Sequence, residues 1–145
     1  MPSEYRMTRR VEFADTDMAG IMHFANFFRF MEVTEHAFFR SLGLSIHMED
    51  EGRSIGWPRV HASCDYKQPL SFEDEVEVHL IVREKKSKSL TYEFIFRKPG
   101  EEGPVEVARG RITAVCVMLD SESGRMRAVT IPEVIASRIE VAASN

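Results

Sequence analysis

The segment that most constrains the fold runs from about residue 24 to residue 42. Its apolar residues recur at steps of three and four, the spacing of one helical face, and further apolar residues such as Phe30 and Phe39 fall on other faces. Several neighbours must therefore cover this helix. No Pro or Gly interrupts it before Gly43, which stands where a C-cap glycine is expected. We expect a long buried helix with a sheet wrapped around it. The residues at helical spacing are Phe24, Phe27, Phe28, Met31, Glu35, Phe38 and Leu42.

The remaining chain is dominated by strand patterns. An alternating segment at 5–13 precedes the helix, and a polar connection with glycines follows it at 45–56. Four further strands are expected at 60–66, 74–84, 89–96 and 105–119, and Pro132 opens a short helix to about residue 141. Within the last strand, Arg109-Gly110 indicates a bulge or a close backbone approach. This order predicts an α+β fold with an antiparallel sheet of about five strands.

Length, composition and charge narrow the class further. The 145 residues amount to about one domain, expected to span 1–145, and six of the ten phenylalanines lie in or beside the helix. The net charge of −4 disfavours nucleic acid as a partner. No apolar stretch approaches the roughly 18 residues of a membrane span, and the first residues lack the apolar core of a signal peptide. We expect no membrane association and a cytoplasmic location, with Cys64 and Cys116 as reduced thiols.

The densest polar cluster is the loop segment Asp15-Thr16-Asp17, just before Gly20 and the start of the helix. Exposed amides at a helix N-terminus stabilise negative charge, including an oxyanion that forms at a substrate carbonyl. A carboxylate beside such amides suits acyl transfer. The residues alone leave a second reading open, in which both aspartates only bond to nearby backbone amides in a turn.

The histidines and lysines leave similar alternatives. His23 is the one histidine near the aspartate loop, where it has either an acid–base or positioning role or a structural one. No histidine spacing supports a metal site, and nucleotide-loop and serine-hydrolase motifs are absent. The basic residues Lys85, Lys86 and Lys88 are expected at a turn between strands, where they are either a solvated hairpin tip or point charges for phosphate groups.

The segment 11–27, VEFADTDMAGIMHFANF, resembles the signature of the hotdog-fold acyl-CoA thioesterases of the 4-hydroxybenzoyl-CoA thioesterase family. The resemblance continues through Glu32, Arg40 and residues 42–44 in the helix, then through 66–70 and 74–76, so it covers nearly the whole chain. It implies a long helix wrapped by a curved antiparallel sheet. It also implies homodimers with a continuous sheet, commonly assembled into homotetramers, whose active sites form between subunits.

The resemblance assigns roles to individual residues. Asp17 is implied to be the catalytic carboxylate, either attacking the thioester or activating water, with His23 close to it. The oxyanion amide falls on or beside Phe24, at the start of the helix. Coenzyme A is part of the substrate, so no separate cofactor is implied. Residues implied to bind the substrate are Gly20, Ile21, Met22, Asn26 and Phe27, and those implied to bind the coenzyme A phosphates are Lys85, Lys86 and Lys88.

Substrate and activity within this fold stay open at the level of sequence. Ile21, Met22, Phe24 and Phe27 either line an acyl pocket or pack in the core, and an aromatic or short to medium acyl group is expected. Alternatives are a thioesterase for acyl-carrier protein, a non-catalytic acyl-CoA-binding protein, and a dehydratase, since one fold hosts several activities.

Overall fold

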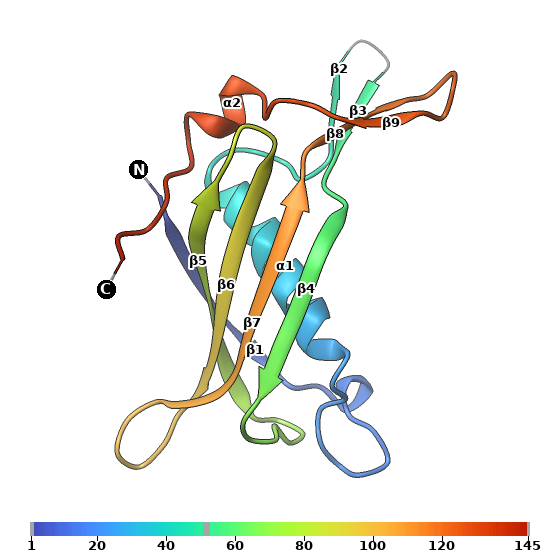
Figure 1. The fold of residues 1–145 in the computed structure, drawn as a ribbon. Coiled ribbons are helices and arrows are strands. Elements are labelled where there is room, and N and C mark those ends of the chain that lie inside the picture. The colour runs from blue at the N-terminus through green and yellow to red at the C-terminus, as the bar shows by residue number, and fades with distance from the viewer. Residues whose placement is uncertain (1, 51–52, 145) are drawn as a thin grey trace.

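The computed structural model describes residues 2–50 and 53–144, and Figure 1 shows how their elements are arranged. A short 3-10 turn at Phe13–Asp15 separates the first strand from the long helix. The two helices are α1 (Asn26–Ser41) and α2 (Glu133–Ala136). The nine strands among the described residues are β1 (Glu4–Arg10), β2 (Met48–Asp50), β3 (Arg53–Gly56), β4 (Arg59–Tyr66), β5 (Glu75–Lys85), β6 (Ser89–Lys98), β7 (Val105–Val115), β8 (Val117–Asp120) and β9 (Met126–Ala128).

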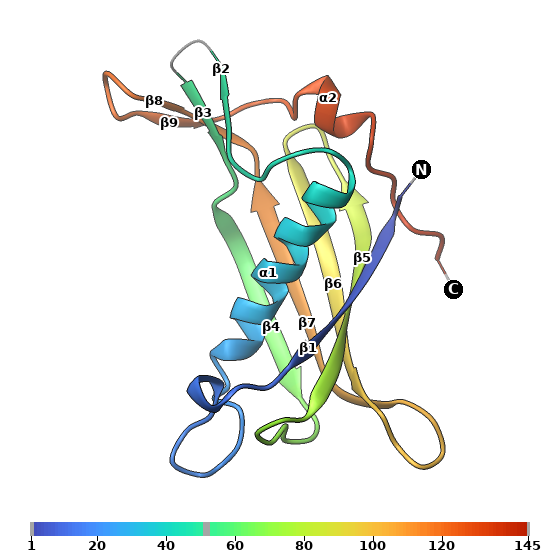
Figure 2. The same ribbon diagram turned by 180° about the vertical axis from the view of Figure 1, so that it is seen from behind.

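The larger sheet has five strands in the order β1-β5-β6-β7-β4, and all neighbouring pairs are antiparallel. Seen from behind, α1 lies across one face of this curved sheet (Figure 2). The α+β prediction and the wrapped central helix are thereby confirmed. The order leaves β1 and β4 as the two outer strands, so one edge of each has no partner strand among residues 2–50 and 53–144.

The core between α1 and the sheet is rich in phenylalanine, as the helix pattern predicted. Phe30, Phe38 and Phe39 of α1 are fully buried, and so are Phe94 and Phe96 of β6. A Schellman motif ends the helix, because the amide of Gly43 donates to Arg40 and that of Leu44 donates to Phe39. Gly43 has φ +76°, which confirms the C-cap glycine.

One buried ion pair ties α1 to the unpaired edge strand. The carboxylate of Glu35 is only 1% exposed and accepts two hydrogen bonds from the guanidinium of Arg59 on β4, at 2.6 and 3.0 Å. Burial beside Glu35 raises the pKa of Tyr92 well above its ordinary value, so its hydroxyl stays neutral. Glu35, which the sequence placed on the main helical face, thus fixes β4 against the helix.

The boundaries differ from the predictions in several places, and β9 was not predicted. Residues 45–56 were expected to form a connection, but their described part contains β2 and β3, and residues 51–52 lie outside the described residues. The expected strand 105–119 is interrupted at Cys116 and becomes β7 and β8. The first strand ends at Arg10, and α2 ends at Ala136, before the expected residue 141. β2 and β3 join β8 and β9 in a small second sheet, which projects from one end of the molecule (Figure 1).

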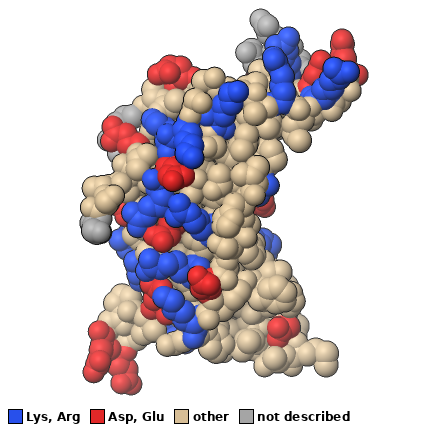
Figure 3. All heavy atoms as spheres, viewed as in Figure 1, with Lys and Arg blue, Asp and Glu red and all other residues tan. Residues whose placement is uncertain are grey.

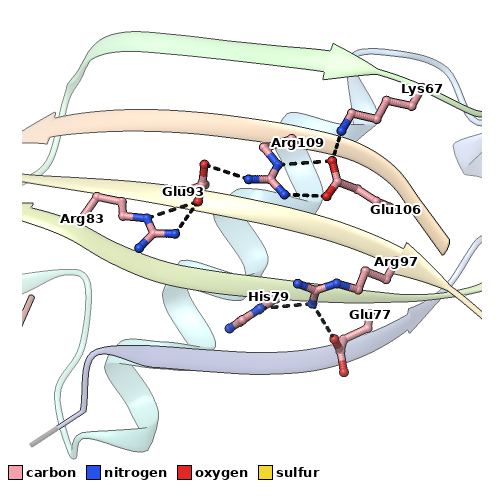
Figure 4. A network of polar contacts seen from close by, with 8 residues as sticks. All are labelled: Lys67, Glu77, His79, Arg83, Glu93, Arg97, Glu106 and Arg109. Atoms are coloured by element: carbon pink, nitrogen blue, oxygen red, sulfur yellow. Dashed lines mark hydrogen bonds and ion pairs between the residues drawn. The ribbon is translucent and has the colours of Figure 1, made fainter. Parts of the chain in front are cut away.

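The outer face of the large sheet is covered by paired charges, and Figure 3 shows positive and negative side chains interspersed down it. Glu93 accepts from Arg83 on β5 and from Arg109 on β7, while Glu106 pairs with Arg109 and Lys67 (Figure 4). These side chains reach across neighbouring strands. The lower end of the molecule, near the 14–25 loop, shows few charges in the same view. No described helix is long and apolar enough to cross a membrane.

Candidate active site

Asp17 lies at the first position of a tight turn between β1 and α1. Its carbonyl accepts the amide of Gly20 at 3.0 Å, and Gly20 has φ +82°, a conformation that suits glycine. One carboxylate oxygen, Oδ1, accepts the amide of Ala19 at 2.9 Å. The other oxygen, Oδ2, accepts no hydrogen bond from the described residues, and the side chain is exposed. The turn therefore orients the carboxylate and leaves one oxygen available to a ligand.

Asp15, two residues earlier, has a different environment. It is 1% exposed, pairs with the guanidinium of Arg29 and accepts the amide of Glu12 at 2.8 Å. Its carbonyl accepts from the amide of His23 and from the side-chain amide of Asn26, at 2.9 and 2.8 Å. Asp15 is thus the structural centre of the loop. Asn26, expected to contact substrate, donates to the Asp15 carbonyl, and Gly20 closes the turn that holds Asp17.

His23 and Phe24 stand at the beginning of α1. The imidazole of His23 stacks on the ring of Phe24, with centroids 4.6 Å apart, and its Nδ1 accepts the amide of Ala25 at 3.2 Å. Because Nδ1 is an acceptor, the proton of the neutral ring is on Nε2. The backbone amide of Phe24 donates to no acceptor in the described part of the chain. It is therefore available to a ligand, and it is at the position where the family resemblance implies the oxyanion amide.

A pocket of about 450 Å³ has both Asp17 and Phe24 in its lining. Of the predicted substrate residues, Ile21, Met22 and Phe27 line it, whereas Gly20 and Asn26 do not, and His23, predicted among the catalytic residues, is not in the lining either. The structure thus answers the open choice between pocket and core: Met22 and Phe27 are nearly buried and still line the pocket, while Phe24 is 63% exposed. The complete lining is Asp17, Ile21, Met22, Phe24, Phe27, Tyr66, Lys67, Gln68 and Pro69.

Residues 66–69, at the end of β4, form the wall that the site prediction missed. The ring of Tyr66 lies perpendicular to Phe27 at 5.0 Å and perpendicular to Phe24 at 6.4 Å. Its hydroxyl donates to the carbonyl of Phe24 at 3.0 Å. The available signal was the segment Tyr66–Leu70 of the family resemblance, which marks this stretch without saying that it faces the aspartate loop.

The predicted phosphate-binding lysines do not lie near this pocket within one chain. Lys85, Lys86 and Lys88 lie at the β5–β6 turn, at the opposite end of the sheet from the 14–25 loop (Figure 1). The length of β5, roughly 36 Å at 3.3 Å per residue, separates the two ends. Lys85 also donates to the carbonyls of Ala136 and Ile139, at 2.9 and 2.7 Å.

A second cationic group lies at that same far end, on the small sheet. Arg53, Arg125 and Arg127 line a pocket of about 210 Å³. With the described residues none of these three guanidinium groups forms an ion pair, although the carboxylate of Asp120 also lines the pocket. The sequence analysis missed this group, because the three arginines are separated by up to 74 residues and meet only through pairing of β3, β8 and β9.

Other chemistries find little support in the geometry. Among residues 2–50 and 53–144, no three histidine, cysteine or carboxylate side chains come together as a metal site would require. Cys64 and Cys116 are free thiols, and burial raises the pKa of each to about 11. Thiolates, the nucleophilic form, are thus disfavoured at both positions.

The profile of the thioesterase-like superfamily matches residues 11–139. The chain belongs to this superfamily. This thioesterase is 27% identical over 135 residues to the 4-hydroxybenzoyl-CoA thioesterase of Pseudomonas sp. strain CBS-3, covering 91% of this chain and 94% of the relative. The predicted family, the hotdog fold and the enzyme class, a thioester hydrolase, are therefore confirmed.

Two further relatives cover most of this thioesterase. The 1,4-dihydroxy-2-naphthoyl-CoA hydrolase of Nostoc punctiforme is 31% identical over 124 residues, which is 82% of this chain and 78% of the relative. A solved gentisyl-coenzyme A thioesterase superposes with a TM-score of 0.74 at 32% identity, covering 91% of this chain and 99% of that one. Both matches extend well beyond the aspartate loop into the sheet.

Proposed function

We propose that this thioesterase hydrolyses an aromatic acyl-CoA to the free acid and coenzyme A. One observation carries the proposal: Asp17, with a carboxylate oxygen that has no partner among the described residues, and Phe24, whose amide has none either, line the same pocket, and its walls include three aromatic side chains. The three relatives above are named for aromatic acyl groups, 4-hydroxybenzoyl, 1,4-dihydroxy-2-naphthoyl and gentisyl. A flat aromatic acyl group fits the aromatic walls of the pocket, and it is the kind of acyl group in the names of these relatives.

The reaction needs few groups beyond these two. A thioester carbonyl is electrophilic, and a thiol with a pKa of about 8.5 leaves readily as thiolate. The amide of Phe24 donates to the carbonyl oxygen as negative charge develops on it. Asp17 either attacks the carbonyl carbon through Oδ2, forming a mixed anhydride that water then opens, or takes a proton from the attacking water. His23, stacked on Phe24, supports this segment from outside the pocket.

The coenzyme A phosphates require cations, and the described residues of one chain place a single one in the pocket lining. Lys67 is the cation in the lining, and it pairs with Glu106. The lysine turn and the arginine group of the small sheet both lie at the far end of the sheet. A second subunit, running antiparallel along the free edge of β4, brings its far end toward the first subunit's pocket.

The same edge supports a homodimer with a shared sheet as part of the proposal. β4 offers unpaired backbone groups, which proteins cover or pair. Around its ends lie exposed apolar side chains, which mark contact surfaces. A dimer joined here completes the active site, and a homotetramer of two such dimers is the larger assembly expected from the family. The exposed residues concerned are Phe13, Met18, Phe24, Val60, Tyr66 and Phe72.

The test is a panel of benzoyl-, hydroxybenzoyl-, butyryl- and palmitoyl-CoA, with released thiol measured by a thiol-reactive dye. We expect the aromatic thioesters to be hydrolysed fastest, and Asp17→Asn to lower kcat by about two to four orders of magnitude. Glu140→Gln, which changes an exposed carboxylate in the C-terminal segment, is the matched control. Binding of acyl-CoA without release of thiol would contradict the proposed hydrolysis. Faster turnover of acyl groups carried by acyl-carrier protein would contradict the proposal that the substrate is a coenzyme A thioester.

A single-turnover experiment in ¹⁸O-labelled water separates the two routes for Asp17. If the carboxylate attacks, hydrolysis of the anhydride at its aspartyl carbonyl leaves label in Asp17. If the carboxylate acts as a general base, all label enters the released acid.

A further inference from the structure

The position of residue 24, whose amide is proposed to stabilise the transition state, depends on the hydrogen bonds to its carbonyl. Residue 24 precedes α1, which begins at Asn26, so its amide is outside the regular ladder of the helix. Its carbonyl accepts two hydrogen bonds, one from the amide of Phe27 at 3.3 Å and one from the hydroxyl of Tyr66 at 3.0 Å. The shorter of the two comes from a strand 42 residues away.

We infer that Tyr66 is a positioning and specificity-determining residue of this thioesterase, whose hydroxyl fixes residue 24 and whose ring forms a wall for a flat acyl group. The inference rests on the proposed function and deepens it. Nothing in the assignment of Asp17 and Phe24 requires a hydroxyl at the end of β4. The role arises because Tyr66 contacts the same residue whose amide faces the pocket.

The hydrogen bond between Tyr66 and Phe24 depends on the protonation of the Tyr66 hydroxyl. A carbonyl only accepts, so the Tyr66 hydroxyl must donate and must remain protonated. Burial raises the pKa of this hydroxyl to about 12, and the nearby thiol of Cys64 adds to the increase. The link between β4 and the start of α1 therefore persists across the pH range in which a thioesterase operates.

The ring contributes separately from the hydroxyl. Tyr66 stands at 83° to Phe27 and at 89° to Phe24, so the three rings form a corner of perpendicular faces and edges. Aromatic pairs favour such edge-to-face arrangements, and a flat guest in this corner gains them while an alkyl chain does not. Because the hydroxyl anchors the same rings, the width of the corner depends on the Tyr66–Phe24 hydrogen bond.

The two contributions separate experimentally. Tyr66→Phe removes only the hydroxyl, and we expect kcat to fall about tenfold for benzoyl-CoA and butyryl-CoA alike, with KM within about twofold, since a displaced oxyanion donor costs less than a deleted one. Tyr66→Leu also removes the ring, and the preference for benzoyl-CoA over butyryl-CoA should fall a further threefold to tenfold. Tyr5→Phe is the matched control, because the Tyr5 hydroxyl bonds to none of the described residues and its ring packs on Phe38.

A spectroscopic readout makes the test independent of turnover. Loss of the donor to the Phe24 carbonyl should shift the ¹⁵N resonance of the Ala25 amide and speed hydrogen exchange at the Phe27 amide, while resonances around Tyr5 stay unchanged. Unchanged kcat in Tyr66→Phe together with an unchanged preference in Tyr66→Leu would overturn the inference and leave the thioesterase proposal intact. If the wild-type protein hydrolyses no thioester while Tyr66→Phe still shows these amide changes, the proposed function alone is refuted, and the role of Tyr66 in fixing residue 24 stands.

Discussion

Met31 of α1 rests directly on the backbone of Gly110 in β7. A Cβ built on residue 110 would lie 2.8 Å from the Met31 sulfur and closer still to its methyl carbon. The close backbone approach that Arg109-Gly110 suggested is therefore confirmed, and the missing side chain at residue 110 lets α1 pack closely against β7. We predict that Gly110→Ala lowers the free energy of unfolding by about 1–3 kcal/mol through overpacking.

Urea denaturation of this variant checks the prediction. Gly56→Ala is the control, since a Cβ there meets Val117 at an ordinary 3.6 Å. In a Met31→Ala background the cost of Gly110→Ala should shrink, because the two residues share one contact. Equal costs in both backgrounds would show that the helix does not sit on this glycine.

The two aspartates of the loop should separate stability from activity. Asp15→Asn weakens a buried ion pair with Arg29, so we expect the free energy of unfolding to fall by about 1–3 kcal/mol. Asp17→Asn keeps the acceptor for the Ala19 amide at an exposed position and should change stability by less than about 0.5 kcal/mol. Thermal unfolding and turnover, measured on both variants, check this; a large stability loss in Asp17→Asn would contradict it.

The buried pair of Glu35 and Arg59 should matter as a pair. Glu35→Leu alone leaves the guanidinium of Arg59 with only the more distant carboxylate of Glu32, at 3.8 Å, and should lower the free energy of unfolding by about 3 kcal/mol. Glu35→Leu combined with Arg59→Met replaces both charges by apolar groups, and we expect it to recover most of this loss. Denaturant unfolding of the single and double variants decides it, and additive losses would argue against the coupling.

Acid stability should depend on Glu106. Hydrogen bonds from Arg109, together with that from Lys67, lower the pKa of this carboxyl from 4.5 to about 2 (Figure 4). A folded-state pKa below the unfolded value gives stability that is present above pH 4.5 and is lost as pH falls toward 2. The urea midpoint of Glu106→Gln should therefore be lower than that of the wild type near neutrality, and the difference should shrink below pH 4.5 and vanish as pH falls through about 2. Parallel curves down to pH 2 would refute this.

Assembly along β4 predicts a link between oligomeric state and rate. Val60 on this strand is 65% exposed in the isolated chain, and Val60→Asp would bury a carboxylate in the subunit contact. We expect this variant to sediment as a monomer and to lose at least tenfold in kcat/KM. Val141→Asp, at a residue 46% exposed in the C-terminal segment, is the control. A fully active monomer would exclude the shared site.

The elements that were predictable from sequence are those with a clear hydrophobic period. α1 and the strands β4 to β7 each contain enough repeats of 3.6 or 2 residues to be recognised. β2, β3 and β9 have only three or four residues each, too few for a period, and are defined by pairing with each other and with β8.

The candidate site was predictable for the loop and not for its opposite wall. Asp15 and Asp17 are the same type of residue two positions apart in the sequence. Only their burial in the fold distinguishes the carboxylate that holds the loop from the residue that lines the pocket. The contact between Tyr66 and Phe24 spans 42 residues, and no local pattern encodes such a distance. The lysine turn and the pocket lie at opposite ends of the sheet for a similar reason. The sequence predicts how long the strands are, but the end of the sheet at which each turn lies depends on the strand order.

The pocket draws its chemistry and its shape from different segments. The carboxylate belongs to a turn closed by its own backbone hydrogen bonds, with bridges from Thr16 to Met22 and from Ile21 to Ser71 on either side of the pocket loop. The walls come largely from Phe27 in the first turn of α1 and from residues 66–69 at the end of β4, with Ile21, Met22 and Phe24 added by the loop. Substitutions at wall residues outside the loop, such as Phe27, can therefore change which acid is released while the Asp17 turn stays in place. Such a division lets one protein scaffold acquire new substrates by gradual change, with hydrolysis retained at every step.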